Sequence, residues 1–253
     1  MATLKRIRNI IKYGLGPEAK AKKNADKEKQ RKIRFWENKQ WQQNTGFAKR
    51  QYASYDEYVT HQTAKLDKVL PRLLETETED FAEFKRRFQD CVPLSEARSI
   101  LCLGARIGTE VKALHALGYF AVGIDLNPGK DNYYVLPGDF HQIVFPDASI
   151  DAIYCNTLDH TFDLAKLIYE VHRLLRPQGL FITDLVQGFE EGWIPGEYEA
   201  THWRDANTII QEIRRLGNFQ LDHVRDLGFH RRDRWTQAVF RKTAADQTDD
   251  AFV

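Results

Sequence analysis

The chain has 253 residues, enough for one or two domains with a substantial core and no need of disulfides or a structural metal. Charged residues make up 29% and hydrophobic residues 42%, proportions that exclude fibrous and wholly disordered classes. No run of about 18 apolar residues predicts a membrane span, and charged side chains interrupt the apolar stretch where a secretory signal would begin. The three cysteines lack a Cys-x-x-Cys pair, which indicates a reducing, cytoplasmic compartment and no metal site.

The net charge of +1 hides an asymmetry along the chain. Residues 1–34 hold twelve Lys/Arg and three acidic residues, a net charge of +9, so the remainder carries −8. Leu4, Ile7, Ile11 and Leu15 recur at helical spacing with basic residues between them. This pattern favours peripheral contact of residues 1–15 with an anionic membrane, at its inner face. The alternatives are a solvated arm, or one that docks on its own body or on a second subunit in an oligomer. The acidic body argues against nucleic acid as a partner.

The first 95 residues read as helical. Residues 1–50 are predicted to form a basic, partly flexible helical arm. Residues 51–95 are predicted to form a helical cap, with one helix over 52–75 that is kinked near Pro71 and a second over 79–90. Residues 243–253 are polar and acidic, which is typical of a disordered tail.

A regular alternation of strands and helices begins at Ser99 and defines a domain over residues 96–242. Short apolar runs predict five strands, at 100–103, 119–124, 133–136, 150–155 and 180–183, with helices over 109–117 and 164–175. Such alternation predicts an α/β fold with parallel pairing and helices on both faces. After a further helix over 207–216, two alternating runs at 219–227 and 235–241 predict an antiparallel hairpin at the sheet edge.

Polar residues follow the predicted strands where parallel sheets bind ligands. The first strand runs into Gly104-Ala-Arg-Ile-Gly108, where glycine allows a tight turn and the following helix offers free N–H groups. Asp125 ends the second strand, where a carboxylate can accept both hydroxyls of a ribose. Asp139-Phe140 follows the third strand and suits an adenine ring, and Asn156 ends the fourth. Together they predict a nucleotide-binding site.

These residues resemble class I S-adenosylmethionine-dependent methyltransferases of the type 11 kind. The resemblance rests on Cys102-Leu-Gly-Ala-Arg-Ile-Gly108, Gly123-Ile-Asp125-Leu-Asn127, the stretch Gly138–Asn156 and Leu174-Leu-Arg-Pro-Gln-Gly-Leu180, and it does not reach residues 1–90. It implies a Rossmann-like, doubly wound, mostly parallel seven-stranded sheet with an antiparallel C-terminal hairpin, plus N-terminal helices. It also implies S-adenosylmethionine as cofactor, bound by Gly104, Ala105, Arg106, Gly108, Glu110, Asp125, Leu126, Asp139, Phe140 and Asn156.

Two departures from the family motif bear on the cofactor's methionine end. Cys102 stands in place of an acid that helps to hold the methionine amino group, and Arg106 stands in place of the middle glycine. Glu110, at the start of the helix, is expected to substitute for the missing acid. Arg106 is expected to pair with the methionine carboxylate or to point to solvent.

The chemistry expected is methyl transfer to a small molecule or glycan, most simply O-methylation. An oxygen of high pKa needs a base, and His160, oriented by Asp159, follows the fourth strand at a suitable place. Residues 190–203, with His202 and Trp203, are expected to form an acceptor lid. Two alternatives stay open: a non-catalytic binding subunit with this fold, and a nicotinamide-dependent oxidoreductase, which the missing middle glycine disfavours.

Overall fold

The computed structural model describes residues 12, 17–37 and 40–243. These form two compact units, divided between Gln42 and Gln43. The first unit contains helix α2 (Pro17–Glu37). No helix in the described ranges combines the length and the apolar character that a membrane span requires. The expected membrane contact lies outside the described residues except for Lys12, and so does the acidic tail except for residue 243.

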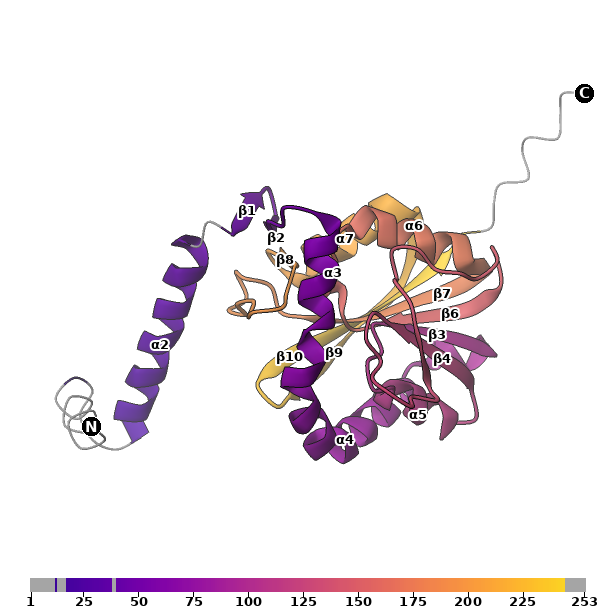
Figure 1. The fold of residues 1–253 in the computed structure, drawn as a ribbon, viewed down its shortest axis with the longest axis horizontal. Coiled ribbons are helices and arrows are strands. Elements are labelled where there is room, and N and C mark those ends of the chain that lie inside the picture. Colours follow the sequence, from indigo (N-terminus) through magenta and orange to yellow (C-terminus); the bar gives the residue numbers. More distant parts are fainter. Residues whose placement is uncertain (1–11, 13–16, 38–39, 244–253) are drawn as a thin grey trace, which may run out of the picture. The chain divides into compact units, whose positions relative to one another are not determined.

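The second unit is built on a seven-stranded sheet with the order β5-β4-β3-β6-β7-β10-β9 (Figure 1). Strands β3 to β7 pair in parallel, and β10 runs antiparallel to both β7 and β9. This confirms the predicted fold class. The strands are β3 (Ser99–Leu103), β4 (Phe120–Asp125), β5 (Val135–Pro137), β6 (Ile150–Cys155), β7 (Leu175–Val186), β9 (Phe219–His230) and β10 (Asp233–Lys242).

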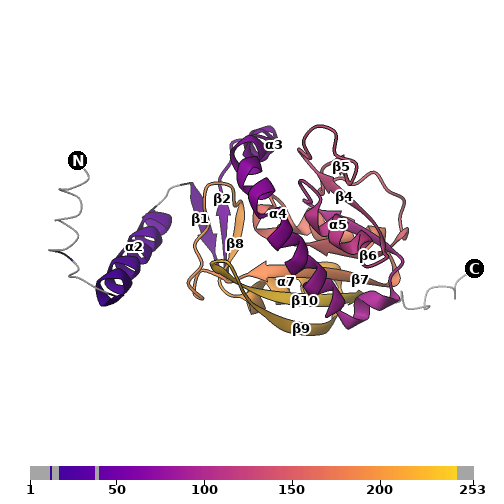
Figure 2. The same ribbon diagram turned by 90° about the horizontal axis from the view of Figure 1, so that it is seen from below.

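Alternating side chains of β3 explain why both faces of the sheet are covered. Leu101 and Leu103 point into a core with helices α6 (Leu164–Leu174) and α7 (Ala206–Gly217). Ile100 and Cys102 point into a second core with α4 (Lys65–Gln89) and α5 (Thr109–His115). Figures 1 and 2 both show α4 lying next to α5. The parallel strands are therefore buried on both sides, as their continuous apolar runs require.

The predicted helical cap consists of α3 (Tyr55–Thr63) and α4, followed by the short 3-10 helix η1 (Val92–Glu96). The side chain of Ser54 caps α3 by accepting a hydrogen bond from the N–H of Glu57. Helix α4 is continuous through Pro71 and ends at Gln89, so the expected break between residues 75 and 79 is absent. The cap does contain two helices, but they separate at Ala64. Packing of α4 on the sheet outweighs the hydrogen bond that Pro71 removes.

A second, smaller sheet has the order β1-β2-β8, from β1 (Trp41–Asn44), β2 (Phe47–Arg50) and β8 (Thr201–Trp203). The sequence reading placed residues 41–50 in a helical arm, which is wrong: Gly46, with φ +92°, turns the chain between two short strands. Ala48 pairs with His202, and Phe47 pairs with Trp203. His202 and Trp203 are thus buried strand residues and do not line the acceptor side as a lid.

Candidate functional site

The Gly104–Gly108 loop leaves β3 at the same sheet edge where β4 and β6 end. Both glycines adopt left-handed backbone conformations, with φ +68° and +79°. A Cβ added at Gly104 would stand 2.3 Å from Oγ1 of Thr157, so only glycine fits this close approach. The loop turns directly into α5, as the sequence predicts, and Thr109 and Glu110 at the start of that helix line a cavity beside the loop.

Asp125 ties this loop to the end of β4. Its Oδ2 accepts a hydrogen bond from the N–H of Arg106 at 3.0 Å, and its Oδ1 accepts one from the N–H of Asn127 at 2.8 Å. Each carboxylate oxygen has a second lone pair left for a ligand hydroxyl. Burial raises the pKa of Asp125. Arg106 takes the left-handed φ of +45° at the family's middle glycine position, so the turn is kept despite the substitution.

The adenine side is closed by the helical cap. A small cavity of about 30 Å³ is lined by Asp125, Leu126 and Phe140 from the sheet edge and by Tyr58 and Leu66 from the cap. The cap side chains thus narrow the space beside Asp125. The chemistry of the donor set fits an adenosyl group, because a ribose-type carboxylate and an aromatic side chain lie together.

Asp139, expected near the adenine, is engaged within the chain. It accepts hydrogen bonds from the hydroxyl of Tyr55 and, at 2.8 Å, from the N–H of His141. His141 is buried and also accepts from the N–H of Asp163 through Nε2. His141 thus has a structural role in this loop. A contact between Asp139 and adenine stays a prediction.

A much larger cavity, of about 860 Å³, lies beside the loop and contains the remaining predicted residues Ala105, Glu110 and Asn156. It shares Gly104, Arg106, Thr157 and His160 with the small cavity. These four residues therefore stand where a nucleoside side meets an acceptor side. Gly108 lies behind the loop, where a Cβ would meet Tyr134 at 2.8 Å.

Glu110 brings a carboxyl group next to the loop where Cys102 lacks one. Glu110 is only 5% exposed, and burial raises the pKa of its carboxyl group to about 8. Cys102 is fully buried on the same face of β3, where burial and the nearby Glu110 raise the pKa of its thiol. The expected role of Glu110 as a substitute for the acid missing at position 102 stays a prediction, and its position beside the loop supports it.

The two residues expected to act on the acceptor, Asp159 and His160, lie in the short 3-10 helix η2 (Leu158–His160). The Nδ1–H of His160 donates to the carbonyl of Tyr198 at 2.9 Å, and Nε2 lies 2.7 Å from Nζ of Lys65. Asp159 Oδ2 is 3.8 Å from Nε2, too far for a hydrogen bond. Tyr198 and Lys65, and not Asp159, therefore orient the ring. Burial and the neighbouring amine of Lys65 hold the pKa of His160 well below its usual value.

Lys65 is the functional side chain that sequence reasoning missed. It begins α4, 95 residues before His160 in the chain, and only the packing of α4 brings the two together. It is 8% exposed, although lysine is almost never buried without a partner. Burial lowers the pKa of Lys65, and the carboxylates of Glu199 and Asp159 oppose that shift. A buried lysine in the first turn of an amphipathic helix was the available signal.

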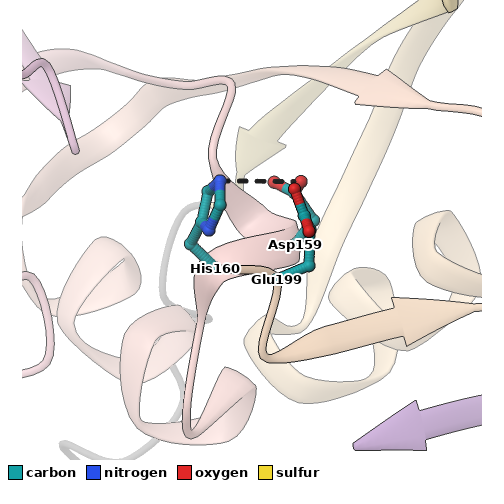
Figure 3. A group of neighbouring side chains, drawn as sticks. All are labelled: Asp159, His160 and Glu199. Carbon is teal, nitrogen blue, oxygen red and sulfur yellow. Dashed lines mark ion pairs between the residues drawn. The ribbon is translucent and has the colours of Figure 1, made fainter. Parts of the chain in front are cut away.

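Figure 3 shows His160, Asp159 and Glu199 converging, with one ligand-type atom from each within 4.8 Å of the others. Such a set has the chemistry of a metal site. Here Nζ of Lys65 lies 2.7 Å from Nε2 of His160, the imidazole nitrogen that faces the carboxylates, so the three side chains form a polar network with Lys65.

Comparisons with known proteins agree with this geometry. Residues 101–183 match the family described as methyltransferase domain. A 1,6-didemethyltoxoflavin-N1-methyltransferase from Burkholderia thailandensis, solved with S-adenosylhomocysteine, superimposes with a TM-score of 0.61 at 14% identity, covering 81% of this chain and 100% of that one. A Thermotoga maritima S-adenosylmethionine-dependent methyltransferase gives a TM-score of 0.55 at 15% identity, covering 73% of this chain and 100% of that one.

A Haloferax volcanii methyltransferase, solved in complex with the activator Trm112, gives a TM-score of 0.56 at 16% identity and covers 73% of this chain and 98% of that one. A search of the curated proteins finds no match. The structural likenesses show the fold, and the family match lies on the strands and loops that carry the site. Residues 101–183 thus match a methyltransferase domain in sequence, and the second unit has the fold in which the Burkholderia thailandensis enzyme binds S-adenosylhomocysteine.

Proposed function

We propose that the protein transfers the methyl group of S-adenosylmethionine to a hydroxyl group of a small molecule or glycan. The observation that carries the proposal is the junction of two cavities at Gly104, Arg106, Thr157 and His160. A nucleoside-side pocket and an acceptor cavity that meet at a few residues allow in-line transfer away from bulk water.

The chain's own residues have distinct parts in this proposal. The N–H groups of the Gly104–Gly108 loop and the carboxyl group of Glu110 hold the methionine end, and Arg106 attracts its carboxylate. Asp125 accepts from the ribose hydroxyls, while Leu126 and Phe140 pack against the adenine ring. The cofactor supplies an already activated methyl group, so the protein's main task is to position the acceptor and to remove its proton.

The test is calorimetric titration with S-adenosylmethionine. Wild-type protein is expected to bind, and Asp125→Ala is expected to lose at least tenfold in affinity because two hydroxyl hydrogen bonds disappear. Asp67→Ala is the matched control, since this exposed aspartate lies on α4 and lines neither cavity. Equal affinity of wild type and Asp125→Ala would remove Asp125 from the site, and absence of binding to folded wild type would overturn the proposal.

Peripheral membrane contact through residues 1–15 is a second, independent proposal, supported by the basic amphipathic pattern. Replacement of Lys5, Arg6, Arg8 and Lys12 by glutamate is expected to abolish co-sedimentation with phosphatidylserine-containing vesicles. Unchanged co-sedimentation of the variant would contradict this proposal and leave the methyltransferase proposal untouched.

A further inference from the structure

The acceptor cavity contains a buried amine, that of Lys65. Nζ of Lys65 lies 2.7 Å from Nε2 of His160 and 3.4 Å from Nδ1. Since Nδ1 donates its proton to Tyr198, Nε2 carries a lone pair and accepts a hydrogen bond from Lys65. A neutral amine still has two N–H groups and one lone pair. Lys65 can therefore keep its bond to His160 and present a free lone pair to the cavity.

Several charged groups from different elements face this amine. Asp159 and His160 come from η2, Glu199 and the ring of Tyr198 from the loop before β8, Arg106 from the loop after β3, and Asp125 from the end of β4. Arg106 disfavours the charged amine, while the three carboxylates favour it. A proton that reaches Lys65 thus enters a region where carboxylates stabilise the resulting ammonium.

The walls of the cavity indicate what kind of molecule brings that proton. The ring of Tyr198 lies beside the amine, with its centroid 5.5 Å from Nζ of Lys65, whereas the aromatic side chain of Phe84 lines the far end of the cavity, about 28 Å further along α4. An aromatic ligand bound at Lys65 can therefore pack against Tyr198 through stacking or edge contacts. An aliphatic alcohol holds its proton too strongly for a buried amine to remove, whereas a phenolic hydroxyl is much closer in acidity.

We propose that the acceptor is a phenol and that Lys65 is a catalytic residue that takes the proton of its hydroxyl group. This inference rests on the proposed methyltransferase function. The O–H bond breaks and its proton goes to the neutral Nζ of Lys65. The oxygen electron pair forms the bond to the methyl carbon, and the electron pair of the broken carbon–sulfur bond stays on sulfur. The positive charge of the sulfonium is thereby replaced by that of the Lys65 ammonium, next to Asp159 and Glu199. His160 acts as a positioning residue through its hydrogen bond to Lys65.

The first experiment tests the amine in the unaltered protein, without an acceptor. Wild-type protein is labelled with a trace of 1-fluoro-2,4-dinitrobenzene over a range of pH, and the rates at Lys65 and Lys68 are compared by mass spectrometry. Lys68 is the matched control: it lies three residues along α4, is exposed, and pairs with Glu197 at 2.7 Å, which raises its pKa. Labelling of Lys65 is expected to reach half its maximum at least two pH units below that of Lys68. Coincident profiles would show a permanent ammonium and would overturn the proposal.

The second experiment tests the acceptor class and the role in catalysis. Wild type, Lys65→Met and Lys85→Met are incubated at pH 7.5 with S-adenosylmethionine and either phenols (phenol, catechol) or thiophenol, which is already ionised and needs no base. Lys65→Met is expected to lose 10²- to 10⁴-fold in kcat/KM with the phenols and less than tenfold with thiophenol. Lys85→Met, a lysine of α4 that lines neither cavity, is expected to stay near wild type for both. If Lys65 had only a structural role, Lys65→Met would lower kcat/KM with the phenols and with thiophenol by a similar factor.

The outcomes separate the inference from the function on which it rests. Methylation of phenols with wild-type kcat/KM by Lys65→Met would overturn the role of Lys65. Cofactor binding by wild type without methylation of either phenol would overturn the acceptor class. Absence of cofactor binding by wild type would overturn the proposed function itself.

Discussion

Helix α4 is held to the sheet by a buried ion pair, and removing one partner should be costly. The side chain of Arg87 is 3% exposed and donates to Oδ2 of Asp184 at 3.0 Å, a carboxylate that is fully buried. Asp184 also accepts from the hydroxyl of Tyr154 at 2.7 Å and from the amide of Gln237 at 2.9 Å. Arg87→Met keeps most of the packing volume but leaves this carboxylate without its positive partner. The typical cost of such a broken pair is about 3–5 kcal/mol.

Urea unfolding followed by circular dichroism measures this cost. A loss of 3–5 kcal/mol corresponds to a decrease in Tm of about 6–20 °C for a unit of roughly 200 residues. Arg86→Met is the matched control, because Arg86 is 48% exposed and pairs with Glu83 on the surface. Exposed pairs contribute about 1 kcal/mol or less. The reasoning is refuted if the two variants lose equal stability, or if Arg87→Met loses less than about 1 kcal/mol.

Two further changes test the cofactor loop. Gly104→Ala places a Cβ 2.3 Å from Oγ1 of Thr157 and should lower the unfolding free energy by about 2–4 kcal/mol. Gly118→Ala, also at positive φ but in open space, should lose only about 1–2 kcal/mol; equal losses in denaturant titration would contradict the overlap. The pKa of Glu110 is raised to about 8 in the folded chain, which therefore binds more protons than the unfolded chain above pH 4.5. Stability relative to Glu110→Gln should accordingly fall as pH rises from about 4.5 to 8, and parallel pH profiles of the two proteins would argue against the buried carboxyl.

The sheet could be predicted because its signals are local. Each of β3, β4 and β6 is a short apolar run that ends at a glycine or a polar residue. Both faces of these strands are buried, so their sequences are continuously apolar and can be recognised as buried strands. The position of Asp125 follows from the same signal, since a strand end fixes the place of the next side chain. The polar residues that follow β3, β4 and β6 therefore lie at one edge of the sheet, as expected.

Features that depend on distant partners could not be predicted. The β1-β2 hairpin is polar and short, and the small sheet is completed by residues 201–203, which pair with β2 from far along the chain. Strand β7 begins at Leu175, before the turn at Pro177-Gln-Gly179, because Leu175 pairs with Ile150 and the register then shifts so that Leu180 pairs with Ala152. Without knowledge of the partner strand, the turn residues 177–179 inside β7 are interpreted as the end of the preceding helix.

The helical cap contributes residues to both cavities of the site. Because the cap lies outside the methyltransferase motifs, those motifs alone could not predict the whole site. One end of the cap covers the nucleoside side through Tyr58 and Leu66, and the first residue of α4, Lys65, reaches His160 at the acceptor side. The other end of α4 is fixed by the ion pair of Arg87 with Asp184. The cap therefore contributes side chains to both cavities, and the contact of Lys65 with His160 depends on the packing of α4 along its whole length.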